Sequence, residues 1–176
     1  MKKNIVLSLI LISLVVVARL MPHVWNVAPV AAVALLAGVY LPKKWGWSVP
    51  LLAMFISDSL IGFYDAGVML SVYVSYLAMF WFAHYVKPNQ AWQWLGASLA
   101  SSTFFFVVTN FAVWASSNWY EKSWSGLQLC YYLALPFFRN TMLGDLIYVG
   151  ALAGAMSLVV NYNSLRQSLK SWYFNN

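Results

Sequence analysis

The chain has 176 residues, of which 62% are hydrophobic, 18% aromatic and only 8% charged. Because charged residues make up about a quarter of an ordinary soluble domain, this composition excludes that class and indicates a polytopic membrane protein in a lipid bilayer. The formal charge of +6 comes from Lys and Arg residues that stand singly or in pairs between apolar runs. Membrane topology explains that distribution better than a nucleic-acid partner does.

Six apolar runs, separated by Pro, Asn, Gly or charged residues, are predicted to be membrane-spanning helices. They cover residues 4–21, 28–41, 49–64, 68–86, 95–115 and 141–160. The first run has the layout of a signal peptide but no small-x-small cleavage site, so we expect it to remain as a helix.

One further helix is expected at residues 125–135, ahead of Pro136, in an interfacial or re-entrant position. Asn140 is well placed to cap the span that follows, because its side chain can accept hydrogen bonds from the first helical turn. The predicted fold is therefore an all-α bundle of six transmembrane helices with one extra helix before the last span. The whole chain forms a single integral membrane domain.

Basic residues distinguish the two predicted sides of this bundle. With the N-terminus inside, the inner side holds Lys2, Lys3, Lys43, Lys44, Lys87, Arg166 and Lys170. The outer side holds Arg19, Lys122 and Arg139. An excess of basic residues marks the cytoplasmic side of membrane proteins, so we expect both termini to be cytoplasmic.

Polar residues inside the spans indicate a site near the outer face. Ionisable side chains at membrane depth are costly unless they are paired or hydrated, and Asp58 and Asp145 are two of them. At about 1.5 Å per helical residue, Asp58, Asn110 and Asp145 lie roughly 8 to 9 Å below the outer ends of their helices. The candidate substrate-binding residues are Arg19, His23, Asn26, Asp58, Asn110, Trp114, Tyr131, Arg139, Asn140 and Asp145.

Two interpretations of this group remain open. An aromatic cavity with a few convergent polar groups is the usual form of a small-molecule pocket. The same residues also fit a structural network in which Arg19 and Arg139 neutralise Asp58 and Asp145.

The sequence contains no phosphate-binding glycine loop, no His-Glu-x-x-His helix and no Gly-x-Ser-x-Gly elbow. We therefore expect no metal, no cofactor and no catalytic residues. An intramembrane enzyme that uses Asp58, Asp145 and Arg139 is a lesser alternative.

Five motifs resemble those of a family of small, uncharacterised bacterial inner-membrane proteins. They are Arg19-Leu-Met-Pro-His23, Asn26-x-x-Pro29, Ser57-Asp58, Thr109-Asn110-Phe111-x-x-Trp114 and Pro136-Phe-Phe-Arg-Asn-Thr-x-x-Gly-Asp145. The resemblance runs through most of the chain and implies a location in the bacterial inner membrane. It implies no established chemistry.

More distantly, six spans with an outward-facing polar and aromatic cavity resemble the substrate-binding S components of energy-coupling-factor (ECF) vitamin transporters. That resemblance implies capture of a vitamin-like nutrient and, as a partner, a T component driven by ATPases. S components typically carry an Ala-x-x-x-Ala surface on their first helix, whereas the nearest such pair here is Ala28 and Ala32 in the second span. We therefore expect a substrate-capture subunit or a solitary importer of a small nutrient. The alternative is a scaffold or assembly protein of the cell envelope without a ligand.

Overall fold

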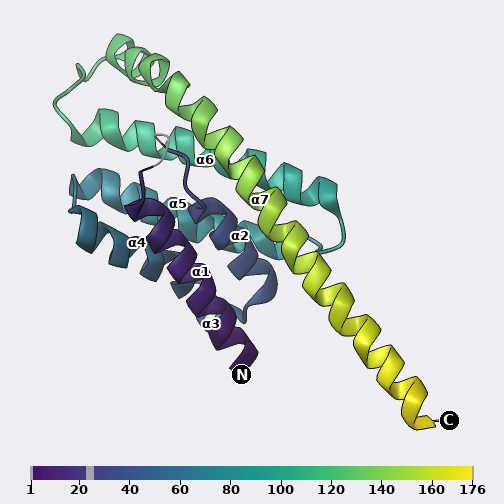
Figure 1. Ribbon diagram of the computed structural model, residues 1–176. Helices are drawn as coiled ribbons and strands as arrows, with labels where there is room; N and C mark the ends of the chain where they lie inside the picture. The colour runs from purple at the N-terminus through teal and green to yellow at the C-terminus, as the bar shows by residue number, and fades with distance from the viewer. Residues whose placement is uncertain (1, 23–25, 176) are drawn as a thin grey trace.

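The computed structural model describes residues 2–22 and 26–175, with side chains described as far as Tyr162. Its elements are α1 Lys2–Leu20, α2 Val30–Tyr40, α3 Lys43–Gly46, α4 Ser48–Ile61, α5 Ala66–Phe82, the 3-10 helix η1 Ala83–Tyr85, α6 Ala91–Ser116 and α7 Trp124–Asn175 (Figure 1). The predicted all-α bundle is confirmed, and each of the six predicted spans falls on a helix.

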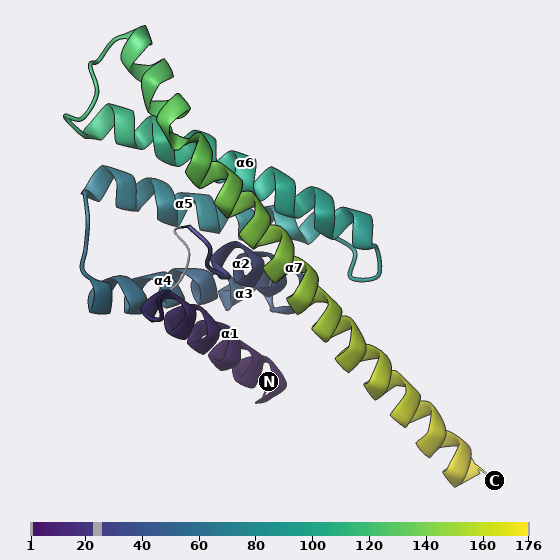
Figure 2. The same cartoon turned by 45° about the horizontal axis from the view of Figure 1, so that its top comes forward.

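The short helix α2 lies at the centre of the bundle and contacts every other element (Figure 1 and Figure 2). Its residues Val30–Gly38 are all buried, so the helix is covered on every side. Many of them are Ala or Gly, and small residues let neighbouring helix backbones approach closely, which stabilises helix association where water is absent. The core of the protein is therefore built around α2.

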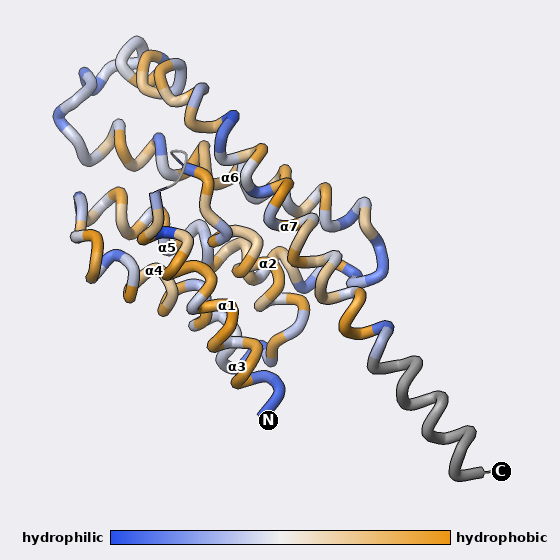
Figure 3. The backbone as a smooth tube through the Cα atoms, in the orientation of Figure 1, coloured by the Kyte–Doolittle hydropathy of each residue, from blue (hydrophilic) through white to orange (hydrophobic). Residues whose placement is uncertain are grey.

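The outer helices present apolar side chains to their surroundings. Four segments are long and apolar enough to cross a membrane: α1, Ala66–Tyr85, α6 and Trp124–Tyr162. The helix α1 buries Ser8, Leu11 and Val15 on one face, while large apolar residues on its other faces are exposed. Figure 3 shows this apolar character along most of α1. Because such a surface is stable in lipid and not in water, the protein is membrane-embedded.

The helix α7 contains Pro136 and continues through it without a break. The predicted interfacial helix 125–135 and the predicted span 141–160 are therefore parts of one helix. The capping role predicted for Asn140 is wrong, because this residue lies inside α7. Proline removes one backbone hydrogen bond, but helices inside a membrane bundle tolerate that loss when neighbouring groups satisfy the freed backbone. The helix bends near its beginning instead of ending (Figure 1 and Figure 2).

Successive spanning helices run in alternating directions, which divides the bundle into two ends (Figure 1 and Figure 2). One end, which we call the lysine end, holds the start of α1, the α2–α4 connection and the α5–α6 connection. Its lysines are Lys2, Lys3, Lys43, Lys44 and Lys87. The opposite end holds the α1–α2, α4–α5 and α6–α7 connections. The fold therefore groups these lysines as the topology prediction requires.

Asp65 caps α5 at the end of the bundle opposite the lysine end. Its Oδ1 accepts a hydrogen bond from the backbone N–H of Val68 at 2.9 Å and another from Ser116 Oγ at 2.8 Å. Both bonds lower the pKa of Asp65 below its ordinary value of 3.8, and the bond from Val68 makes the larger contribution. The start of α5 is thereby joined to the end of α6.

The closest packing of α2 gives a test of its central role. A Cβ atom at Gly38 would lie 2.6 Å from the Cβ of Ala83 and closer still to the carbonyl oxygen of Phe80. We expect Gly38→Ala to destabilise the protein by about 1–3 kcal/mol, because the extra methyl group overpacks the core. Gly154→Ala on α7 is the matched control, since a Cβ there meets nothing within 4 Å. Thermal melting in detergent measures both, and equal melting temperatures for the two variants would contradict the prediction.

Candidate ligand-binding site

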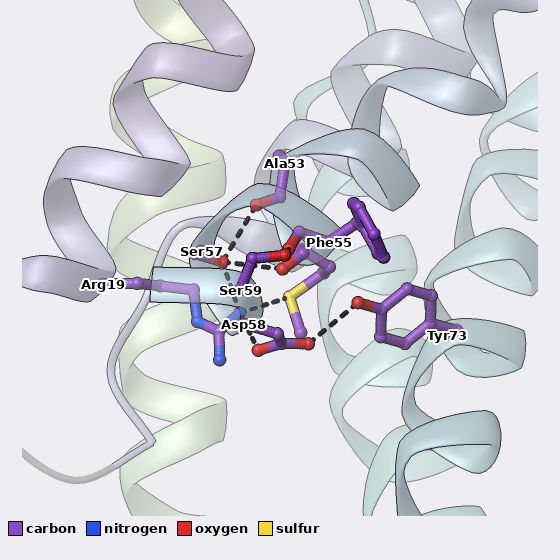
Figure 4. A network of polar contacts seen from close by, with 8 residues as sticks. Arg19, Ala53, Phe55, Ser57, Asp58, Ser59 and Tyr73 are labelled. Atoms are coloured by element: carbon purple, nitrogen blue, oxygen red, sulfur yellow. Dashed lines mark hydrogen bonds and ion pairs between the residues drawn. The ribbon is translucent and has the colours of Figure 1, made fainter. Parts of the chain in front are cut away.

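An ion pair between Arg19 and Asp58 joins the end of α1 to α4 (Figure 4). Arg19 Nη1 lies 2.8 Å from Asp58 Oδ1, and the same nitrogen donates to Ser57 Oγ at 2.6 Å and contacts Met54 Sδ at 3.1 Å. Tyr73 of α5 donates to Asp58 Oδ2 at 2.9 Å. The Asp58 side chain is 1% exposed. Both carboxylate oxygens of this buried acid therefore have a partner.

The local sequence places both members of the pair near helix ends. Arg19 lies in the last turn of α1, where a cation interacts favourably with the helix dipole. Ser57 Oγ donates to the carbonyl oxygens of Ala53 and Met54, each at 2.9 Å, which leaves its lone pairs available to Arg19. The Ser57-Asp58 motif therefore supplies two adjacent acceptors to one guanidinium group.

Asp145 is the second buried acid, and its surroundings differ from those of Asp58. Its side chain is 4% exposed, and Oδ2 accepts a hydrogen bond from Ser102 Oγ of α6 at 2.6 Å. Among the described residues, Oδ1 has no hydrogen bond and the carboxyl group has no ion pair. A buried carboxylate without a cationic partner is costly, so Asp145 is the least compensated acid of the bundle interior.

A cavity of about 230 Å³ lies between these two acidic sites. Its polar wall consists of Arg19, Asn26, Tyr64, Tyr76, Thr141 and Asp145. Ala28 and apolar side chains of α2, α4, α5 and α6 complete the lining. A wall that carries a guanidinium group on one element and a carboxyl group on another can orient a small polar molecule.

A second cavity of about 270 Å³ adjoins the first and shares Asn26, Val72, Phe105 and Thr141 with it. Its lining is mostly aromatic and aliphatic, and it includes Asn110. Together the two cavities approach the size of ordinary small-molecule pockets, roughly 300–1,000 Å³. A cavity with a polar wall thus lies beside a more apolar one.

The structure brings part of the predicted site together. Arg19, Asn26 and Asp145 line the first cavity, and Asn110 lines the second. Asp58 lies behind Arg19 as its ion-pair partner, which confirms that half of the predicted pairing.

Other predicted site residues lie elsewhere. Trp114 Nε1 donates to the carbonyl oxygen of Glu121 at 2.9 Å, and Tyr131 donates to that of Val107 at 2.6 Å. Both residues therefore stabilise the packing of α6 against α7 and its connection, and neither lines either of the two cavities.

The predicted pairing of Arg139 with Asp58 or Asp145 is wrong. Arg139 is exposed on α7, Asp58 pairs with Arg19, and Asp145 bonds to Ser102. Asn140 is half-buried and lines neither of the two cavities. His23 lies outside the described residues.

Sequence reasoning missed Tyr73, Tyr76 and Ser102. Tyr73 and Tyr76 stand three residues apart in an apolar span, which places their hydroxyl groups on one side of α5. Ser98 and Ser102 stand four apart on α6 in the same way. Hydroxyl groups at helical spacing inside a span were the available signal.

The ion pair yields a prediction on stability. Arg19→Met leaves the buried Asp58 carboxylate unpaired and is expected to cost roughly 3–5 kcal/mol, whereas the double variant Arg19→Met, Asp58→Asn removes both charges and costs much less. Melting temperatures of the single and double variants in detergent measure the difference. A double variant no more stable than Arg19→Met would show that the two residues do not compensate each other.

No curated protein and no solved structure matches the chain. The profile of one protein family matches residues 1–168. The chain therefore belongs to that family, which is described as a family of unknown function, DUF6580.

Proposed function

We propose that the protein binds a small polar nutrient in the paired cavities and takes part in its import without catalysing a reaction. The observation that carries this proposal is Asp145, a 96% buried carboxyl group without a cationic partner among the described residues, on a cavity wall that Arg19 also lines. A purely structural acid would be expected to have its countercharge within the fold, as Asp58 has. A bound ligand supplies that countercharge in the proposed function.

The proposed orientation places the lysine end in the cytoplasm of a bacterial cell, so that the cavities lie toward the outer face of the inner membrane. The positive-inside rule supports this orientation, because the lysine end collects Lys2, Lys3, Lys43, Lys44 and Lys87. Reporter fusions within residues 118–123 and at the C-terminus should report opposite compartments. The same compartment for both would contradict the proposed orientation.

Coupling to an ECF-type T component and its ATPases is the more specific form of this proposal, and the fold bears on how such coupling would work. The pair formed by Ala28 and Ala32 is not available as a docking surface, since Ala32 is fully buried and Ala28 lines the first cavity. We therefore propose a solitary importer, or a capture subunit that contacts its partner through another surface.

Native mass spectrometry of protein purified in mild detergent tests ligand capture. We expect the wild type to retain a small molecule that Asp145→Asn loses, while the variant still melts near the wild-type temperature because asparagine keeps an acceptor for Ser102.

Asp65→Asn is the matched control, since it removes a carboxylate outside both cavities. It should retain the molecule. Wild-type protein without any retained molecule would favour the alternative, a scaffold of the cell envelope that has no ligand.

A further inference from the structure

Among the residues that the structure describes, the charges around the first cavity do not cancel. Arg19 and Asp58 neutralise each other at 2.8 Å, and the remaining ionisable acid on the wall is Asp145. Tyr64 and Tyr76 contribute hydroxyl groups and no positive charge. An occupant that brings a positive charge to Asp145 would therefore complement this wall.

We infer, on the basis of the proposed function, that the ligand is a small organic amine whose protonated nitrogen binds Asp145 Oδ1 and whose oxygen acceptor binds Arg19. Asp145 Oδ1 is available for this bond, because the hydrogen bond from Ser102 goes to Oδ2. The ammonium group and the carboxylate form a charge-assisted hydrogen bond, which is stronger than a neutral one.

Arg19 supplies the complementary donors. Its contacts with Met54, Ser57 and Asp58 all use Nη1. Nε and Nη2 have no hydrogen bond among the described residues, and Figure 4 draws no interaction from the other terminal nitrogen. Because Arg19 lines the cavity, these N–H groups can donate to a hydroxyl or carbonyl oxygen of the ligand.

Aromatic rings accommodate the rest of such a ligand. Tyr76 and Phe105 both line the first cavity, with ring centroids 5.4 Å apart, and a cation is attracted to the face of an aromatic ring. Phe105 also lines the second cavity, which offers an apolar chamber for a hydrocarbon body. An anionic ligand would place a second negative charge near Asp145 and is disfavoured.

Three probes of one shape separate the possibilities by isothermal titration calorimetry in detergent. Phenylalaninol carries an amine and a hydroxyl group, hydrocinnamyl alcohol lacks only the amine, and hydrocinnamate is the anion. We expect wild-type protein to bind phenylalaninol at least about tenfold more tightly than hydrocinnamyl alcohol, with hydrocinnamate weakest. Asp145→Asn should lower phenylalaninol affinity to that of the alcohol, whereas the control Asp65→Asn should leave it unchanged.

The outcomes distinguish this inference from the proposed function. The inference of an amine ligand is wrong if hydrocinnamate or the alcohol binds more tightly than phenylalaninol. It is also wrong if wild type and Asp145→Asn bind phenylalaninol equally well. In both cases the cavity is still a ligand site. If none of the three probes binds but native mass spectrometry shows a retained molecule, only the inference of an amine ligand is wrong. If no probe binds and no molecule is retained, both proposals are wrong. The comparison among probes uses wild-type protein, so it does not depend on how well the variant folds.

Discussion

The enclosure of α2 by every other element is the constraint on which the bundle depends. At 11 residues, α2 is only about 16 Å long, roughly half the thickness of the hydrocarbon core of a bilayer. The longer helices around it therefore extend beyond its beginning. The first cavity is lined by Ala28, Val30 and Ala31. It therefore lies at the beginning of the central helix, where the neighbouring helices continue past it. A short central helix thus creates the space for the proposed site.

Several polar side chains of this interior form hydrogen bonds or ion pairs with one another. The pair of Arg19 and Asp58 connects α1 to α4, and Tyr73 adds α5 to the same network (Figure 4). Such a pair is weak evidence for stability, because removing two charges from water is itself costly. Its value lies in fixing the position of the end of α1 by a directional polar contact, in addition to the apolar packing of Leu11 and Val15 in the core.

Hydropathy predicted where the helices lie. The cost of burying charge predicted that Asp58 and Asp145 belong to a binding site or to a structural charge network. Neither signal indicates which helices are neighbours, so the sequence could not choose between Arg19 and Arg139 as the partner of Asp58. The prediction of a helix break at Pro136 was wrong for a related reason. The hydrogen bond that proline removes predicts a break, whereas packing against the surrounding bundle makes a continuous helix possible. Trp114 and Tyr131 have the composition of a pocket wall, but their hydrogen bonds are used between α6 and α7.

The length of α7 has a structural consequence. Its 52 residues measure about 78 Å along the axis, more than twice the hydrocarbon thickness of a bilayer, so no ordinary tilt contains the helix within the lipid. One part carries Thr141 and Asp145 on the cavity wall, and the far end projects beyond the bundle (Figure 1). One continuous helical backbone therefore connects the cavity wall to a segment that lies outside the rest of the bundle.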